Sequence, residues 1–160
     1  MKTVSFTGHR ILKADDETIG NLVAVLIKLI SDGSTDFYGG GALGWDMLCE
    51  KAVLELREKF SDIKLHLILP CPPEEQTAFW LIPQIEEYQK ILKSADSVEI
   101  VSKHYSKNCM KRRNERLAEL GDVCVCYYNE KRRRSGTGQT VRLAEKSGRE
   151  IINLFNEHKD

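Results

Sequence analysis

The sequence predicts an α/β fold: one three-layer, doubly wound domain with a mainly parallel sheet, spanning residues 1–160. Apolar residues switch repeatedly between the two-residue period of strands and the 3.6-residue period of helices. Glycine-rich or polar turns follow several of the predicted strands, and no linker divides the 160 residues. Strands joined by helices run parallel, so the helices are expected to cover both faces of one sheet.

The first part of the chain predicts three strands and two helices. Short apolar runs bounded by turn residues predict the strands, and charged stretches with apolar residues at helical spacing predict the helices. In chain order these elements are a strand at 3–7, a helix at 16–31, a strand at 35–38, a helix at 43–59 and a strand at 64–69.

The second part repeats this alternation after a proline-rich stretch at residues 70–83, which predicts an irregular loop that could serve as a lid. Cys124 and Cys126 alternate within a continuous apolar run, so they are expected to share one face of a strand covered on both sides. Six strands and five helices result, a Rossmann-like pattern. The remaining elements are a helix around 84–92, a strand at 97–101, a helix at 110–120, a strand at 123–128, a helix at 140–147 and a strand at 150–154.

Composition narrows the possible partners. Apolar residues make up 41% and charged residues 30% of the chain, and 24 basic residues balance 24 acidic ones. A formally neutral protein lacks the general cationic field that attracts DNA or anionic membranes, so any anion site is expected to be local and nucleic acid is a disfavoured partner. Apolar runs are too short to span a bilayer, and the N-terminus leads directly into a strand. We therefore expect a cytoplasmic protein with reduced cysteines and no membrane contact.

Three turns at predicted strand ends have the composition of a ligand site, because open parallel sheets bind ligands outside the carboxyl ends of their strands. Glycine-rich turns before helices can cradle phosphate, and Ser135 or Thr137 can cap a helix while offering donors to an anion. Purely structural roles stay open, since tight turns need glycine and helices need caps without any ligand. The candidates are Thr7, Gly8, His9 and Arg10 after the first strand, Gly39, Gly40, Gly41 and Gly44 after the second, and Ser135, Gly136 and Thr137 after the fifth.

Polar residues on two helices complete the candidate ligand-binding set. Basic residues around the start of the helix at 110–120 oppose its dipole unless an anion is bound, and helical spacing turns Arg113 and Asn114 inward. Asp46, in the first turn of an earlier helix, could accept a ribose hydroxyl or simply complement the helix dipole. The run Arg132–Arg134 is expected to be an exposed, mobile loop. No metal site is expected, and no catalytic residue is assigned.

Taken together, these motifs resemble the YpsA-like branch of the SLOG superfamily, which groups Rossmann-like domains related to DprA and to the Lonely Guy phosphoribohydrolases. The resemblance covers nearly the whole chain. It rests on Phe6–Arg10, Gly39–Asp46, Pro70-Cys71, Cys109-Met110 with Arg113-Asn114, and Ser135–Thr137. It implies a site for a nucleotide or nucleotide-derived phosphate at the strand ends, with a sensor or effector role. Nucleotides, NAD and ADP-ribose derivatives are the candidate ligands, no cofactor is required, and a homodimer is a further expectation.

Two departures from these relatives leave other functions open. Lonely Guy enzymes carry a catalytic glutamate after their Gly-Thr motif, whereas Thr140 stands at that spacing here. A nucleotide N-glycoside hydrolase would then need Asp46 or His9 as its acid or base. Single-stranded nucleic-acid binding of the DprA type is a second alternative, weakened by the neutral charge.

Overall fold

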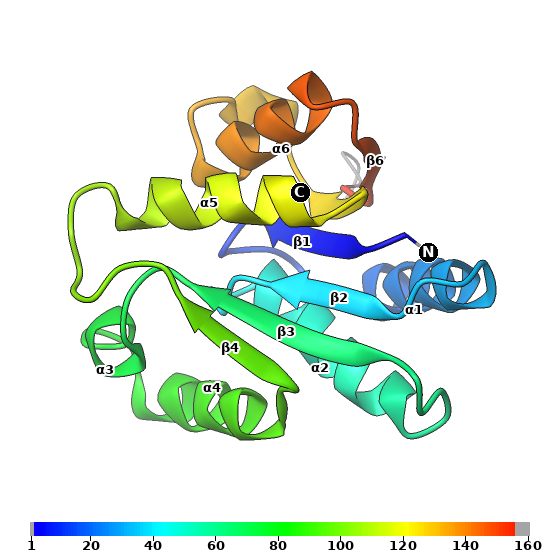
Figure 1. Cartoon of the computed structure of the whole chain (residues 1–160), viewed down its shortest axis with the longest axis horizontal. Coiled ribbons are helices and arrows are strands. Elements are labelled where there is room, and N and C mark those ends of the chain that lie inside the picture. The colour runs from blue at the N-terminus through cyan, green and yellow to red at the C-terminus, as the bar shows by residue number, and fades with distance from the viewer. Residues whose placement is uncertain (1, 156–160) are drawn as a thin grey trace.

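A six-stranded parallel sheet forms the middle layer of the protein (Figure 1). The computed structural model describes residues 2–155. Strand order is β4-β3-β2-β1-β5-β6, a doubly wound order of Rossmann type. The strands are β1 (Val4–Gly8), β2 (Asp36–Gly39), β3 (Lys64–Leu69), β4 (Ser97–Ile100), β5 (Val123–Tyr127) and β6 (Glu150–Asn153).

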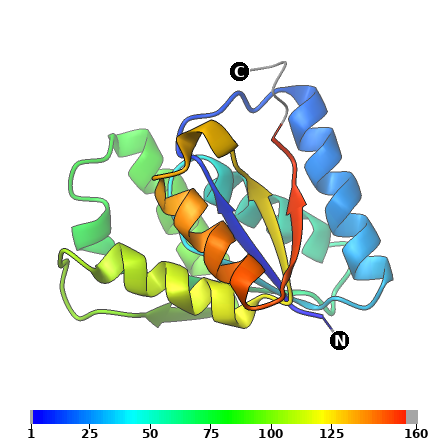
Figure 2. The same ribbon diagram turned by 90° about the horizontal axis from the view of Figure 1, so that it is seen from above.

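Helices cover both faces of the sheet, which gives the three predicted layers. Figures 1 and 2 show α5 and α6 packed together over one face, while α1, α2 and α4 lie on the other. The short α3 lies beside α4, beyond the end of β3. The bounds are α1 (Asp16–Ser31), α2 (Trp45–Arg57), α3 (Pro73–Gln76), α4 (Ile82–Ser94), α5 (Cys109–Leu120) and α6 (Gly136–Lys146).

The predicted α/β class is confirmed, with corrections to individual elements. Six α-helices are present in the described residues rather than five, because residues 73–76 form the short helix α3 inside the expected loop. A proline at its first position suits a helix start, since that residue needs no backbone N–H donor. Helix α6 begins at Gly136 rather than at 140, because the Ser135 hydroxyl accepts a hydrogen bond from the Gly138 N–H and caps it there. Within the segment 132–134, expected to be a mobile loop, Arg132 instead ends a 3-10 turn, Glu130–Arg132.

Two apolar layers hold the helices to the sheet. Phe6 and Val125 belong to the larger layer, which packs against α1, α2 and α4. Cys124 and Cys126 belong to the smaller one, with Val141 of α6, so the prediction that both cysteines share one face is confirmed. All five residues of β5 are buried, as expected for a strand covered on both sides. Within residues 2–155 no helix is long and apolar enough to cross a membrane.

The start of α2 is held tightly against the end of β1. Trp45 is fully buried, its backbone N–H donates to the His9 carbonyl at 3.2 Å, and its indole N–H donates to the Val125 carbonyl at 3.3 Å. Gly44 precedes it with a φ of 83°, and a Cβ there would lie 2.3 Å from the Arg10 carbonyl oxygen. Only glycine fits this position without strain. The close approach fixes α2 relative to the turn after β1.

The Gly44→Ala variant should lose roughly 2–4 kcal/mol of unfolding free energy, because its side chain meets both a positive φ and the backbone of Arg10. Urea denaturation measures this loss. Gly20→Ala is the matched control: Gly20 lies in α1, and beyond its neighbours and its own helix backbone a methyl group there would have no atom within 4 Å, so alanine should add about 0.5–1 kcal/mol. Equal stability of the two variants would contradict the packing described here.

Candidate functional site

A cavity of about 440 Å³ opens at the carboxyl end of the sheet, where β1 lies between β2 and β5. The chain leaves β1 for β2 through α1 on one face and enters β5 from α5 on the other, so this is the switch point of the doubly wound sheet. We call it the strand-end cavity. Its lining residues are Thr7, Gly8, His9, Arg10, Ile11, Ala42, Asp46, Met110, Arg113, Asn114, Leu117, Arg132, Ser135, Gly136 and Thr137.

The turn after β1 is fixed by His9, which is buried. Its Nε2 accepts a hydrogen bond from the Asn129 backbone N–H at 2.9 Å, and its backbone N–H donates to the Tyr127 carbonyl at 3.3 Å. A ring nitrogen that accepts from an N–H carries no proton, so this contact favours the neutral tautomer with the proton on Nδ1. His9 thereby joins the β1 turn to the segment after β5.

Arg113 of α5 is buried, and it reaches across the sheet end to the turn after β2. Its guanidinium donates to the Gly40 carbonyl at 2.6 Å and to the Asn114 side-chain oxygen at 2.9 Å. A Cβ on Gly40 would lie 2.5 Å from this guanidinium and 2.9 Å from the Asp46 carboxylate. The glycine at position 40 therefore leaves room for a buried cation and a buried carboxyl side by side.

Burial is the largest cause of the pKa shifts of Asp46, Glu50 and Arg113. It raises the pKa of Asp46 from 3.8 to about 6, although the Arg113 charge and the backbone N–H groups of Ala42 and Gly40 oppose the rise. Burial also raises the pKa of Glu50 well above its usual value, and the negative charge of Asp46 adds to that rise. Burial lowers the pKa of Arg113, while both carboxyl groups act in the opposite direction.

Glu50 is fully buried behind the glycine turn. Its Oε2 accepts a hydrogen bond from the Gly41 N–H at 2.9 Å, while its Oε1 has no hydrogen-bond partner among the described residues. This burial, together with the nearby negative charge of Asp46, raises the pKa of Glu50 and so favours its protonated form. The Gly41 N–H is therefore used inside the protein, and the turn supports Arg113 and α2 from behind.

Asn114 and Ser135 connect α5 with the start of α6. The Asn114 amide donates to the Gly136 carbonyl at 3.5 Å and to the Gln139 side-chain oxygen at 3.4 Å. Ser135 caps α6, as described above, which leaves the N–H groups of Gly136 and Thr137 without an acceptor inside the helix. The positive end of the α6 dipole therefore borders the cavity.

The structure brings most of the predicted ligand-binding residues together around one cavity. Thr7, Gly8, His9, Arg10, Asp46, Arg113, Asn114, Ser135, Gly136 and Thr137 all line it, whereas Gly39, Gly40, Gly41 and Gly44 do not. The turn at 39–44 lies directly behind the lining, where Gly40 and Gly41 bond Arg113 and Glu50. Ligand contact by any of these residues stays a prediction.

Sequence reasoning missed two charged contributors. Arg132 was expected in an exposed loop, and it is exposed, yet it also lines the cavity. The signal was its short distance in sequence from Ser135, the cap of α6. Glu50 was not singled out, although it follows Asp46 by one helical turn on the buried side of α2.

The charges around the strand-end cavity favour an anion. Arg10 and Arg132 are exposed at its rim, Arg113 is buried in its wall, and Asp46 is the carboxyl group in the lining. A local excess of positive charge therefore exists in a chain whose formal net charge is zero. Within residues 2–155, no group of three or more His, Cys, Asp or Glu side chains is placed to hold a metal ion.

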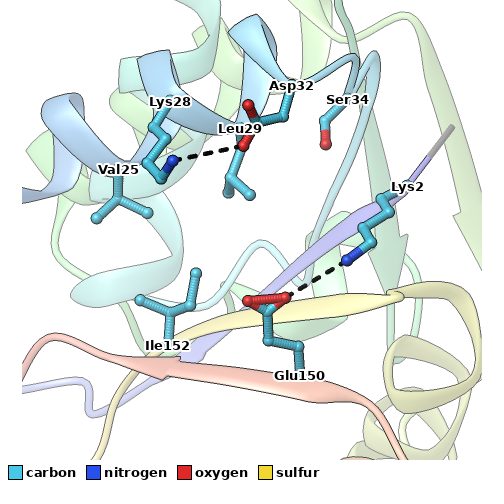
Figure 3. Close-up of a pocket in the computed structure, with 8 residues that line it drawn as sticks. All are labelled: Lys2, Val25, Lys28, Leu29, Asp32, Ser34, Glu150 and Ile152. Carbon is cyan, nitrogen blue, oxygen red and sulfur yellow. Dashed lines mark ion pairs between the residues drawn. The ribbon is translucent and has the colours of Figure 1, made fainter.

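A second hollow, of about 370 Å³, lies at the opposite end of the sheet, between α1 and β6 (Figure 3). Its charged groups pair with one another: Lys2 with Glu150 and Lys28 with Asp32, each at 3.7 Å. Exposed pairs of this kind stabilise little and leave these four charges already compensated. The strand-end cavity is thus the stronger candidate site.

The fold and the cavity define a Rossmann-like α/β domain with a cationic hollow at its topological switch point. Residues 13–155 match the YspA SLOG family, also named YpsA, so the chain belongs to this family. The match starts after the β1 turn and includes α5, the start of α6 and the glycine turn. The predicted family membership is confirmed.

Relatives and a solved structure agree with this assignment. The chain is 28% identical to a UPF0398 protein of Bacillus cereus strain G9842, and 26% identical to one of Bacillus thuringiensis strain Al Hakam, covering 100% of this chain and 94% of each relative. DNA processing protein A from Helicobacter pylori, studied for single-stranded DNA binding, has a similar structure with a TM-score of 0.64 and 18% identity. That likeness covers 94% of this chain but 63% of the other, and at this identity it shows the fold alone.

Asp46→Asn should change how stability depends on pH. A carboxyl whose folded pKa is about 6 and whose unfolded value is 3.8 stabilises the fold below pH 4, and this contribution is lost as pH rises through 6. The asparagine variant should therefore gain about 2 kcal/mol relative to the natural protein as the pH rises from 4 to 7. Urea denaturation across this range measures the difference. Asp62→Asn, at an exposed position, is the control, and a constant difference for Asp46→Asn would contradict the assignment.

Proposed function

We propose that this protein binds the phosphate group of a nucleotide or nucleotide derivative in the strand-end cavity and acts as a sensor or effector. One observation carries the proposal: the buried guanidinium of Arg113 and the first turn of α6 face the same hollow at the switch point. A guanidinium and the N–H groups at a helix start are the donors that bind phosphate in proteins.

The donors are fixed before any ligand arrives. Arg113 is held by Gly40 and Asn114, and Asn114 in turn contacts Gly136 of α6. Preformed donors lose little conformational entropy on binding, so they favour affinity for a small anion. Arg10 and Arg132 at the rim add positive charge where the phosphate would enter.

The cavity suits a ligand larger than inorganic phosphate. Its volume of about 440 Å³ lies within the range of roughly 300–1,000 Å³ found for small-molecule sites. Asp46 in the lining supplies an acceptor for a ribose hydroxyl when it is ionised, and a donor when it is protonated. A sugar phosphate therefore matches the cavity better than an isolated anion does.

Several features argue for binding without hydrolysis. Thr140, which stands where Lonely Guy enzymes carry their glutamate, is buried, and its hydroxyl donates to the Gly136 carbonyl at 3.1 Å. His9 uses its Nε2 to accept from Asn129, which leaves that nitrogen unable to act as a base toward a ligand. Among the described residues Asp46 is then the one carboxyl group in the lining that could act as acid or base in hydrolysis.

Nucleotides incubated with the protein should be recovered intact. AMP and ADP-ribose, each mixed with the purified protein near pH 7 for several hours, should show no released base by liquid chromatography. Release of adenine above the level without protein, and its loss in Asp46→Asn, would overturn the sensor assignment and support the hydrolase alternative.

Arg132→Ala should weaken phosphate binding without disturbing the fold. Arg132 is exposed at the rim of the strand-end cavity, so its loss should reduce the affinity for ribose 5-phosphate about three- to tenfold, as expected for a partly screened charge. Calorimetric titration measures the affinity. Arg134→Ala is the matched control, because Arg134 is exposed in the same segment but does not line the cavity.

Two outcomes would contradict the proposal. Equal affinities in the two variants would remove Arg132 from the site. If neither ribose 5-phosphate nor AMP raises the melting temperature of the natural protein at about 1 mM, binding at this site fails altogether. Charge reversal of Arg113 is a poor test, because it would place a third carboxyl beside Asp46 and Glu50 in the core.

Single-stranded nucleic-acid binding is the second candidate. The fold resembles that of DNA processing protein A, and the basic residues Arg132, Arg133 and Arg134 are exposed beside the cavity. This alternative predicts binding to oligonucleotides that weakens steeply with salt and is little affected by free nucleotides. If the proposed function is right, AMP should compete with any oligonucleotide that binds at the strand-end cavity.

A further inference from the structure

A third hollow, of about 600 Å³, adjoins the strand-end cavity. Arg10 and Met110 line both, so the two spaces meet at these side chains. We call this third hollow the aromatic chamber, because Phe79, Trp80 and Tyr105 line it. Its walls come from the segment around α3 and from the loop between β4 and α5.

The aromatic side chains of this chamber are unusually exposed. Phe79 is 100% accessible to solvent and Tyr105 is 60% accessible. Trp80 is half-buried, with its ring edge-to-face against buried Tyr88 at 5.2 Å and 83°. Large apolar rings left in water at one hollow mark a binding surface, because burial of each would stabilise the protein.

Glu75 holds the two walls of the chamber at a fixed separation. Its Oε1 accepts a hydrogen bond from the Tyr105 backbone N–H at 2.9 Å, and its Oε2 pairs with His104 at 3.5 Å. Glu75 belongs to α3, whereas His104 and Tyr105 belong to the loop before α5. The loop is therefore tied to α3 along one side of the chamber.

Gln76 connects the chamber to the phosphate side of the site. Its amide donates to the Gly41 carbonyl at 3.4 Å, and its oxygen accepts from the Tyr88 hydroxyl at 2.7 Å. The glycine turn that supports Arg113 thus also positions α3. Hydrogen bonds therefore link the donors that face the strand-end cavity to the helix that carries one wall of the aromatic chamber.

We propose that the aromatic chamber holds the base of the nucleotide whose phosphate lies in the strand-end cavity, and this inference rests on the proposed function. A purine or pyrimidine is a flat ring that stacks on aromatic side chains, and Arg10, at the junction, can lie over it as a cation. Shared lining by Arg10 and Met110 makes one ligand the natural occupant of both spaces. The ligand class is therefore a base-bearing phosphate, not a sugar phosphate alone.

Calorimetric titration with ribose 5-phosphate, AMP and ADP-ribose separates the two parts of the site. The natural protein should bind at least one base-bearing probe more than about fivefold tighter than ribose 5-phosphate. Phe79→Ala and Tyr105→Ala should each reduce the affinity for that probe about five- to a hundredfold, the range for one stacked base, and leave the affinity for ribose 5-phosphate unchanged. Leu81→Ala, at a 67% exposed neighbour outside the chamber, is the matched control.

The possible failures are distinguishable. Binding of ribose 5-phosphate as tight as that of AMP and ADP-ribose would overturn the base assignment and leave the phosphate site in place. So would equal affinities for the base-bearing probe in Phe79→Ala, Tyr105→Ala and Leu81→Ala. If the natural protein binds none of the three probes, the proposed function fails and the chamber assignment fails with it. Phe79 and Tyr105 are exposed, so their truncation should keep the fold, and circular dichroism verifies this.

Discussion

The buried contact between Arg113 and the turn after β2 is the constraint on which the site depends. It joins α5, on one face of the sheet, to the start of α2, on the other, through the Gly40 carbonyl. A guanidinium taken out of water requires hydrogen bonds and a nearby opposite charge, and Gly40, Asn114 and Asp46 supply them. Asn114 adjoins Arg113 in the sequence, whereas Gly40 and Asp46 reach it from a distant part of the chain.

Much of this arrangement could be predicted from the residues. Periodicity located α1 and β3 with their observed bounds, and the inward stripe of α5 identified Arg113 and Asn114 as buried. Local patterns of this kind report directly which face of an element is covered. The rule that ligands lie at the carboxyl ends of parallel strands then placed the candidates in one region.

Other features depend on contacts that no local pattern contains. The glycine turn has the composition of a phosphate cradle, yet Gly41 donates to Glu50, which lies on α2. Helix α3 was not predicted because it lies in a proline-rich stretch, and the chamber beside it forms where α3 meets the loop before α5 through Glu75. Arg132 also depends on structure that the local pattern did not indicate: it lines the cavity from the end of a short 3-10 turn.

Because Asp46 lies close to Arg113, anion binding at this site would depend on pH. With a pKa of about 6, the Asp46 carboxyl is largely ionised at neutral pH and compensates the guanidinium. An anion seated at Arg113 would take over that compensation, and its charge would raise the pKa of Asp46 further, so the carboxyl would bind a proton as the anion enters. Proton uptake on binding means that affinity increases as the medium becomes more acidic. Under the proposed function, occupancy of the cavity would therefore depend on the acidity of the medium as well as on the concentration of the ligand.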